Sequence, residues 1–281
     1  MTEASNPSTT QPINQAINQA INHNGNVDSQ FGPRAQAYLT SAVHAAGADL
    51  DQMAALVGQR PDAIALDMGC GGGHVAFLLA PQVQKVVAYD LSESMLAVVA
   101  GEAERRGLSN LVTKCGAAEQ LPCPSASFDL AVTRYSVHHW RDVPAGLAQM
   151  RRVLKPAGAA FFMDVVSPGV PLLDTWLQTL ELLRDPSHVR NASIQEWHSA
   201  LQTAGFNAGV TQSFRLRLDF PTWIARMQTP PAHVEAIRSL QRRAPAEVAD
   251  YFAIEADGSF TVDTMLISAT AQGKVGEESA T

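Results

Sequence analysis

The sequence contains few cysteines. Its 281 residues include only Cys70, Cys115 and Cys123, an odd number without CxxC spacing. These positions exclude a disulfide framework and a cysteine zinc motif, and they favour a reducing cytoplasm as the location. Since no histidines and carboxylates stand at metal-ligand spacing either, the sequence predicts no metal site.

Long apolar runs and an excess of positive charge are also absent. No window approaches the roughly 18 apolar residues of a membrane span, and Met1 to Val27 lacks the basic start and apolar stretch of a signal peptide. Only 17% of the residues are charged, with 20 Lys and Arg against 27 Asp and Glu, so the net charge is −7. An acidic chain is a poor ligand for nucleic-acid phosphates. We therefore expect a soluble monomer or homodimer without a nucleic-acid partner.

The two ends of the chain differ in composition from the middle. Residues 1–27 are rich in Asn, Gln, Thr and Ser and contain an imperfect Ile-Asn-Gln-Ala repeat. Residues 273–281 are similarly polar. Such segments bury too little apolar surface to offset their ordering entropy, so we expect both to be disordered tails. Residues 28–272 are expected to form one domain.

Within this domain, short apolar runs alternate with helical periodicity. The runs cover residues 63–68, 85–90, 111–115, 128–133 and 159–165. This alternation predicts an α/β fold with a doubly wound, mostly parallel sheet. A helix over residues 28–58 is expected to precede the sheet as a lid. Irregular helical inserts at about 165–195 and 220–257 are candidates for a substrate cap, because specificity usually lies in such insertions.

A glycine-rich turn, Gly69–Gly73, closes the first predicted strand and opens a helix. Glycine lets the backbone approach a ligand, and free amides at a helix start receive negative groups, although such turns also occur for structural reasons. Asp90 follows at the tip of the second strand, placed to accept both hydroxyls of an adenosine ribose. Its alternative role is that of a helix N-cap, which Ser92 can also perform.

This arrangement suits either a nicotinamide dinucleotide or S-adenosylmethionine. The dinucleotide fingerprint needs a glycine at the sixth position of the loop, where His74 stands. Asp67 lies inside the apolar strand, where a carboxylate needs a cationic partner such as the ammonium of a methionyl group. Both features favour S-adenosylmethionine over an NAD-dependent oxidoreductase. A non-catalytic S-adenosylmethionine-binding subunit remains a further alternative.

Six motifs in order then carry a resemblance to a known family. They lie at residues 66–73, 90–96, 116–122, 128–129, 134–140 and 152–158. On these motifs the chain resembles the class I S-adenosylmethionine-dependent methyltransferases of the ubiquinone/menaquinone-biosynthesis-like branch (methyltransferase type 11). The resemblance implies a Rossmann-like sheet of seven strands, with Ser259–Ala271 antiparallel, and methyl transfer by in-line displacement to a small organic acceptor at an O, C or N atom. One departure is Ala157, where the family commonly has glycine.

The resemblance also implies which residues bind the cofactor and its product, S-adenosylhomocysteine. Asp67 would hold the amino group, Asp90 the ribose, and Arg134 would close the methionyl side. The lid aromatics can shield the sulfonium by cation–π contact. The full implied set is Phe31, Tyr38, Asp67, Gly69, Cys70, Gly71, Asp90, Leu91, Met95, Ala117, Ala118, Glu119 and Arg134.

Methyl transfer depends mainly on positioning, and it needs a base only if the acceptor is protonated. His138 and His139 follow the fourth strand at its ligand-binding end, so either can take a phenol or enol proton. His188 is the rival candidate. It lies beside Arg184 and Arg190 in a cluster that either clamps an anionic acceptor or forms a salt-bridged cap. For each histidine the alternative is structural hydrogen bonding.

Overall fold

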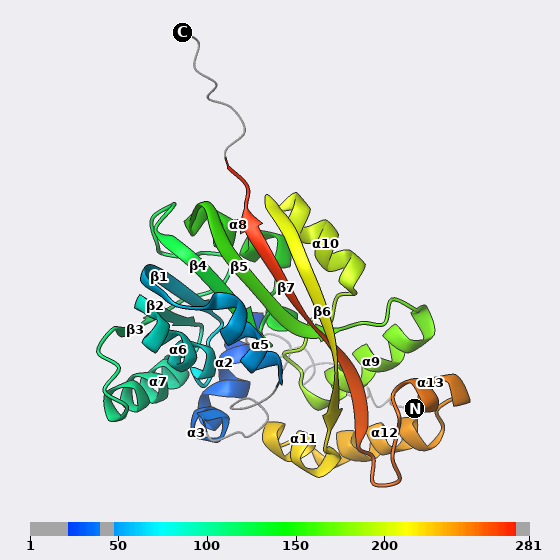
Figure 1. The fold of residues 1–281 in the computed structure, drawn as a ribbon. Coiled ribbons are helices and arrows are strands. Elements are labelled where there is room, and N and C mark those ends of the chain that lie inside the picture. Colours follow the sequence, from blue (N-terminus) through cyan, green and yellow to red (C-terminus); the bar gives the residue numbers. More distant parts are fainter. Residues whose placement is uncertain (1–21, 40–47, 274–281) are drawn as a thin grey trace, which may run out of the picture.

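The computed structural model describes residues 22–39 and 48–273, and its centre is a seven-stranded sheet (Figure 1). The strand order is β3-β2-β1-β4-β5-β7-β6, parallel from β3 through β5, with β7 antiparallel to both β5 and β6. The doubly wound sheet expected from the sequence is confirmed, including its antiparallel last strand. The strands are β1 (Arg60–Met68), β2 (Val83–Asp90), β3 (Leu111–Cys115), β4 (Phe128–Arg134), β5 (Leu154–Val166), β6 (Phe206–Leu218) and β7 (Phe260–Ala271).

Helices cover both faces of the sheet, because both faces of the central strands are apolar. Leu66 and Met68 of β1 face the core under α8 (Val143–Val153) and α10 (Ile194–Thr203). Ala63 and Ala65 of the same strand face the core under α5 (Ala48–Val57), α6 (His74–Leu79) and α7 (Glu93–Arg105). A short turn, η2 (Ala80–Gln82), joins α6 to β2. This period-two alternation, buried on both sides, is typical of parallel sheets.

A third core holds the helices of the two inserts. They are α9 (Pro171–Arg184), α11 (Phe220–Met227), α12 (Pro231–Arg242) and α13 (Ala246–Tyr251). The rings of Trp176 and Phe252 stack at 4.5 Å between centroids, and Trp223 meets Phe260 edge-on at 5.1 Å. In Figure 1, β6 and β7 extend past β5 toward these helices. The strand extensions therefore carry α11, α12 and α13 past the end of β5, where they pack against α9.

The N-terminal segment differs from the single helix expected over residues 28–58. It is broken into α2 (His23–Phe31), the turn η1 (Gly32–Arg34), α3 (Ala35–Leu39) and, after an undescribed stretch, α5. Pro33 lies inside η1, where a residue without an amide hydrogen interrupts α-helical bonding.

The expected disorder of residues 1–27 is also wrong over its last residues. The Asn22 side chain accepts a hydrogen bond from the Gly25 amide and caps α2. His23 Nε2 lies 2.8 Å from the His139 carbonyl oxygen, and Asn26 donates to the Pro186 carbonyl. These tertiary bonds order a polar helix that its composition does not predict. The tails at 1–21 and 274–281 lie outside the described residues.

None of the helices in the described ranges combines the length and the apolar character that crossing a membrane requires.

Candidate functional site

The glycine turn forms the floor of the site. Gly69, Gly71 and Gly73 all have positive φ, at 74°, 49° and 80°, in the region that glycine enters without strain. A Cβ on Gly69 would lie 1.9 Å from Ser136 Oγ. A Cβ on Gly71 would meet nothing within 4 Å, so its backbone faces open space.

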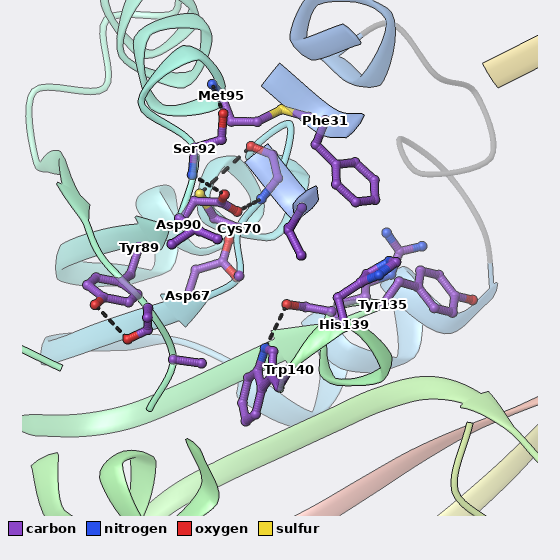
Figure 2. A pocket seen from close by; sticks show the side chains of 18 of the residues that line it. Phe31, Asp67, Cys70, Tyr89, Asp90, Ser92, Met95, Tyr135, His139 and Trp140 are labelled. Carbon is purple, nitrogen blue, oxygen red and sulfur yellow. Dashed lines mark hydrogen bonds between the residues drawn. The ribbon is translucent and has the colours of Figure 1, made fainter. Parts of the chain in front are cut away.

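A cavity of about 1060 Å³ opens beside this turn (Figure 2). All of the residues that the sequence assigned to the cofactor line it: Phe31, Tyr38, Asp67, Gly69, Cys70, Gly71, Asp90, Leu91, Met95, Ala117, Ala118, Glu119 and Arg134. In Figure 2, Asp67 and Asp90 lie on one side of the cavity and Phe31 and His139 on the other. The structure therefore brings the whole set together.

Other residues of this cavity were missed. Asn24 and Val27 come from α2, which the sequence did not predict, and Tyr135 follows β4 with an unusual φ of 51°. Backbone strain of this kind is concentrated at functional sites. The position of Tyr135 next to Arg134, at a strand end, is a signal that could have identified it.

Asp90 braces the turn with its carboxylate. Oδ2 accepts a hydrogen bond from the Gly71 amide at 2.8 Å, and Oδ1 accepts one from the Ser92 amide at 2.9 Å. Burial raises the pKa of Asp90, which these bonds partly offset. The N-cap of α7 is Ser92, whose Oγ accepts from the Met95 amide. Asp90 is thus not the helix cap, and it lines the cavity at the end of β2.

Asp67 is the least compensated group of the site. It is 1% exposed, and neither carboxylate oxygen has a hydrogen-bond partner among the described residues. Burial raises the pKa of Asp67 to about 7, and nearby Asp90 adds to the rise, while Arg134 and the Ala76 amide, which lies near the carboxylate but outside hydrogen-bond geometry, offset only part of it. A buried carboxyl without a partner is unfavourable unless a cation joins it. This arrangement suits a ligand with an ammonium group.

Arg134 lines the cavity but does not offer an unpaired charge. Its guanidinium pairs with Asp49 of α5, with 2.5 Å between Nη2 and Oδ2, and it lies 4.7 Å from the centre of the Tyr135 ring. This pair could not be predicted from the sequence, because 85 positions separate its members. Arg134 therefore anchors α5 at the edge of the cavity.

A second cavity of about 630 Å³ adjoins the first. Both inserts contribute to its wall, and Phe31, Tyr38, Tyr135 and His139 line both cavities. The remaining residues of the second cavity are His138, Val165, Glu181, Arg184, Asp185, Asn191, Leu216, Leu218, Trp223 and Arg226.

His138 lies in η3 (Val137–His139) and forms a dyad with Asp164 of β5. Its Nδ1 is 2.5 Å from Asp164 Oδ1, while Asp164 Oδ2 accepts the Val137 amide. Burial lowers the pKa of His138, but the Asp164 carboxylate outweighs burial and leaves that pKa raised. Because Nδ1–H donates to Asp164, Nε2 is the nitrogen left for chemistry. Nε2 has no hydrogen-bond partner in the described part of the chain.

The pKa of His139 is shifted in the opposite direction to that of His138. Burial and the neighbouring His138 lower its pKa to about 3, so the ring is neutral at neutral pH. Its Nδ1 lies 3.2 Å from the Ser187 carbonyl oxygen, which fixes the proton on that nitrogen. Its Nε2 is therefore a bare acceptor, 4.0 Å from Asp185 Oδ2.

His188 was expected as a rival base, but it lines neither cavity. Its Nε2 contacts Gln178 Oε1 at 2.9 Å, and burial together with His138 lowers its pKa to about 2. The two arginines near His188 in the sequence also lie in different places. Arg190 pairs with Asp174 and Glu196 at the surface, whereas Arg184 lines the second cavity.

In the described ranges, no group of three or more His, Cys, Asp or Glu side chains is arranged to hold a metal ion.

Comparisons with known proteins identify close relatives. A profile of the methyltransferase domain family matches residues 66–162. The protein YafE of Escherichia coli, which is uncharacterized, is 48% identical over 201 residues, or 72% of this chain and 97% of its own. The uncharacterized methyltransferase YcgJ of Bacillus subtilis is 34% identical over 227 residues, or 81% of this chain and 90% of its own.

One solved structure and one relative that matches over part of its length are also similar to this chain. The crystal structure of YcgJ superposes with a TM-score of 0.76 at 32% identity, over 80% of this chain and 98% of its own. The 2-phytyl-1,4-naphtoquinone methyltransferase of Synechococcus elongatus is 39% identical over 124 residues, which is 42% of this chain and 53% of its own.

Proposed function

The chain belongs to the class I S-adenosylmethionine-dependent methyltransferases, and from this premise we propose that it methylates a small organic acceptor bound in the second cavity. One observation carries the proposal: four residues, Phe31, Tyr38, Tyr135 and His139, line both cavities. A donor in the first cavity and an acceptor in the second would meet at this shared wall. Displacement at a methyl carbon gains most of its rate from such close, aligned placement.

The first cavity fits the cofactor on two structural grounds. Asp67 is a buried carboxylate without a partner in the described chain, which suits the amino group of the methionyl part. Gly71 leaves open space where any side chain would intrude. Asp90 would hold the ribose, and Leu91, Met95 and Ala118 would flank the adenine. When bound, the cofactor supplies a methyl group activated by a sulfonium.

We assign proton removal to His138. Asp164 fixes the proton of His138 on Nδ1 and keeps Nε2 as the basic nitrogen. A raised histidine pKa keeps the base effective near neutral pH, where general bases work best. His139, neutral and bare at Nε2, would instead accept a hydrogen bond from the acceptor and orient it. The acceptor atom, whether O, N or C, is not part of the proposal.

The lid would exclude water from the shared wall. Phe31 contacts both Tyr38 and His139 edge-on, with ring centroids 5.4 and 4.9 Å apart. These aromatics also present π-faces and edges beside the place proposed for the sulfonium. The proposal retains the expectations drawn from composition, namely a cytoplasmic enzyme, monomeric or dimeric, that does not act on nucleic acid.

Calorimetric titration tests the assignment of the first cavity. Wild type and Asp90→Ala are titrated with S-adenosylmethionine, S-adenosylhomocysteine and NAD. We expect binding of the two sulfur ligands alone, weakened in the variant by about 2 kcal/mol because hydrogen bonds to a charged group are lost. Binding of NAD alone would overturn the proposal. If the sulfur ligands bind but no member of a panel of phenols, quinols and organic acids is methylated, the result favours a binding subunit that needs a partner.

A further inference from the structure

The second cavity contains a guanidinium that no described residue pairs with. Arg226 of α11 lines it half-buried and forms no hydrogen bond or ion pair with any described residue. Arg184 of α9 lines it too, with Nε donating to the Trp223 carbonyl at 3.1 Å. Glu181 is the carboxylate nearest to Arg184, at 3.6 Å from its Nη1. Asp185 lines the cavity as well, so two carboxylates stand beside the two guanidiniums, and Arg226 is the guanidinium that pairs with neither.

A third guanidinium lies near the shared wall. The Tyr38 hydroxyl, at the shared wall, lies in the field of three guanidiniums, those of Arg184, Arg226 and Arg34, with Asp185 as the opposing charge. Burial and the repulsion of Arg184 lower the pKa of Arg226, and Tyr38 and Glu181 offset only part of this. An anion placed between these arginines would relieve their repulsion.

Polar atoms without partners lie in the same cavity. Both amide atoms of Asn191 and the Oδ2 of Asp185 are buried and make no hydrogen bond with the described residues. Each of these side chains is 1% exposed. Buried polar groups are normally paired, so a donor-bearing ligand is the simplest way to satisfy them. The apolar part of the wall consists of Val165, Leu216, Leu218 and Trp223.

We propose that the methyl acceptor is a small organic acid whose carboxylate or phosphate is bound by Arg226 together with Arg184. Its apolar body would pack on Leu216, Leu218 and Trp223, and its nucleophile would face the shared wall on the side of His138. The inference rests on the proposed function of the second cavity. Guanidinium groups bind carboxylate and phosphate through paired, charge-assisted hydrogen bonds, which is the chemistry that Arg226 offers.

The geometry also decides between the two interpretations of the 185–190 cluster. Arg190 is the salt-bridged member, and its side chain is 45% exposed. Arg184 and Arg226, one from each insert, are the clamp. Arg226 lies more than 30 positions from Arg184 in the sequence, so the spacing of residues could not predict that the two line one cavity.

The test compares acids with amides of the same shape on protein saturated with S-adenosylhomocysteine. Benzoate, phenylacetate, cinnamate and hexanoate are titrated beside benzamide, phenylacetamide, cinnamamide and hexanamide, and phenyl phosphate is included as the phosphate arm. We expect at least one anion to bind about tenfold more tightly than its neutral counterpart, since bonds to a charged group are involved. A preference for phenyl phosphate over benzoate would identify a phosphate ester, and the reverse a carboxylic acid.

Two variants test whether the preference for the anion over the amide arises in the second cavity. Arg226→Gln is expected to abolish the preference for the anion while leaving the affinity for S-adenosylhomocysteine unchanged, which also shows that the variant is folded. Arg190→Gln, the matched control outside the cavity, is expected to keep it.

The inference is overturned if no acid binds better than its amide, or if Arg226→Gln binds the acids as wild type does. Failure of the proposed function looks different, because then S-adenosylhomocysteine itself does not bind.

Discussion

The main chain of Tyr38 rests directly on Gly72. A Cβ at Gly72 would lie 2.9 Å from the Tyr38 carbonyl carbon, closer than real Cβ contacts come, and His74 Nε2 lies 2.9 Å from the Tyr38 carbonyl oxygen. The glycine turn therefore holds α3 as well as the first cavity. A change in the turn should therefore displace the segment of the lid that contains Tyr38.

Gly72→Ala tests this contact. The new methyl group must push Tyr38 away, so we expect the affinity for S-adenosylhomocysteine to fall by about 1–2 kcal/mol, the usual effect of overpacking a tight contact. Isothermal titration calorimetry measures the change. Gly101→Ala is the control, since a Cβ there meets nothing within 4 Å and should leave binding intact. Unchanged affinity in Gly72→Ala would show that the position of the lid does not matter for this cavity.

The affinity of wild type for S-adenosylhomocysteine should depend on pH through Asp67. Its pKa of about 7 means that the carboxyl is mostly protonated below neutral pH and ionised above it. An ammonium group needs the ionised form, so affinity should be full at high pH and should fall about tenfold for each pH unit below the pKa. Titrations between about pH 5.5 and about pH 8.5 cover this range.

Asp67→Asn should bind about 2 kcal/mol more weakly at high pH and show no such slope. Asp51→Asn, which changes an exposed carboxyl on α5, should keep the slope of wild type. A flat profile in wild type would rule out Asp67 as the partner of the ammonium.

The His138–Asp164 dyad predicts how turnover varies with pH once an acceptor is known. The raised pKa of His138 means that the base is protonated at low pH, so kcat should rise with pH through that pKa and then level off. His138→Gln should lower kcat by about 10²–10⁴. Asp164→Asn should lower kcat and shift the rise in kcat to lower pH, because the carboxylate that raises the pKa is gone. Cofactor affinity should stay constant in both variants.

His139→Gln is the comparison that separates the two histidines. We expect a higher KM with the pH profile retained, since a neutral ring with a pKa of about 3 orients the acceptor rather than taking its proton. If His139→Gln loses the rise of kcat with pH and His138→Gln keeps it, the roles are reversed.

Replacing Ala157 by glycine should stabilise the protein. It has a φ of 59° at the position where the family commonly has glycine, and the left-handed region is unfavourable for alanine. Ala157→Gly should raise the free energy of unfolding by about 0.5 kcal/mol, the relief of strain less the entropy that glycine adds to the unfolded chain. Urea denaturation measures it. Ala100→Gly, at an exposed position of α7, should instead lose about 1 kcal/mol. Destabilisation by Ala157→Gly would show that the backbone of β5 is unstrained at this position.

The first cavity could be predicted from the sequence because its residues follow strand ends that local patterns reveal. Gly71 and Asp90 come from two adjacent strands, and parallel strands bring their carboxyl ends to one edge. Asp164 gave the same signal as Asp67, a carboxylate within an apolar strand, and could have been found in the same way.

The second cavity could not be predicted, since its wall depends on packing between distant segments. Arg184 and Arg226 meet only because the extensions of β6 and β7 carry the two inserts to one place. Likewise, α2 has the composition of a disordered tail, and its order comes from bonds to the backbone at His139 and Pro186. Composition describes a segment alone and cannot report such partners.

Phe31 and Tyr38, which belong to one short stretch of the N-terminal segment, wall both cavities at once. On the proposed function, a displacement of this stretch that lets a molecule out of one cavity would open the wall of the other as well. Release of the spent cofactor and of the methylated product would then be coupled, and the rate of that opening would set an upper limit on turnover.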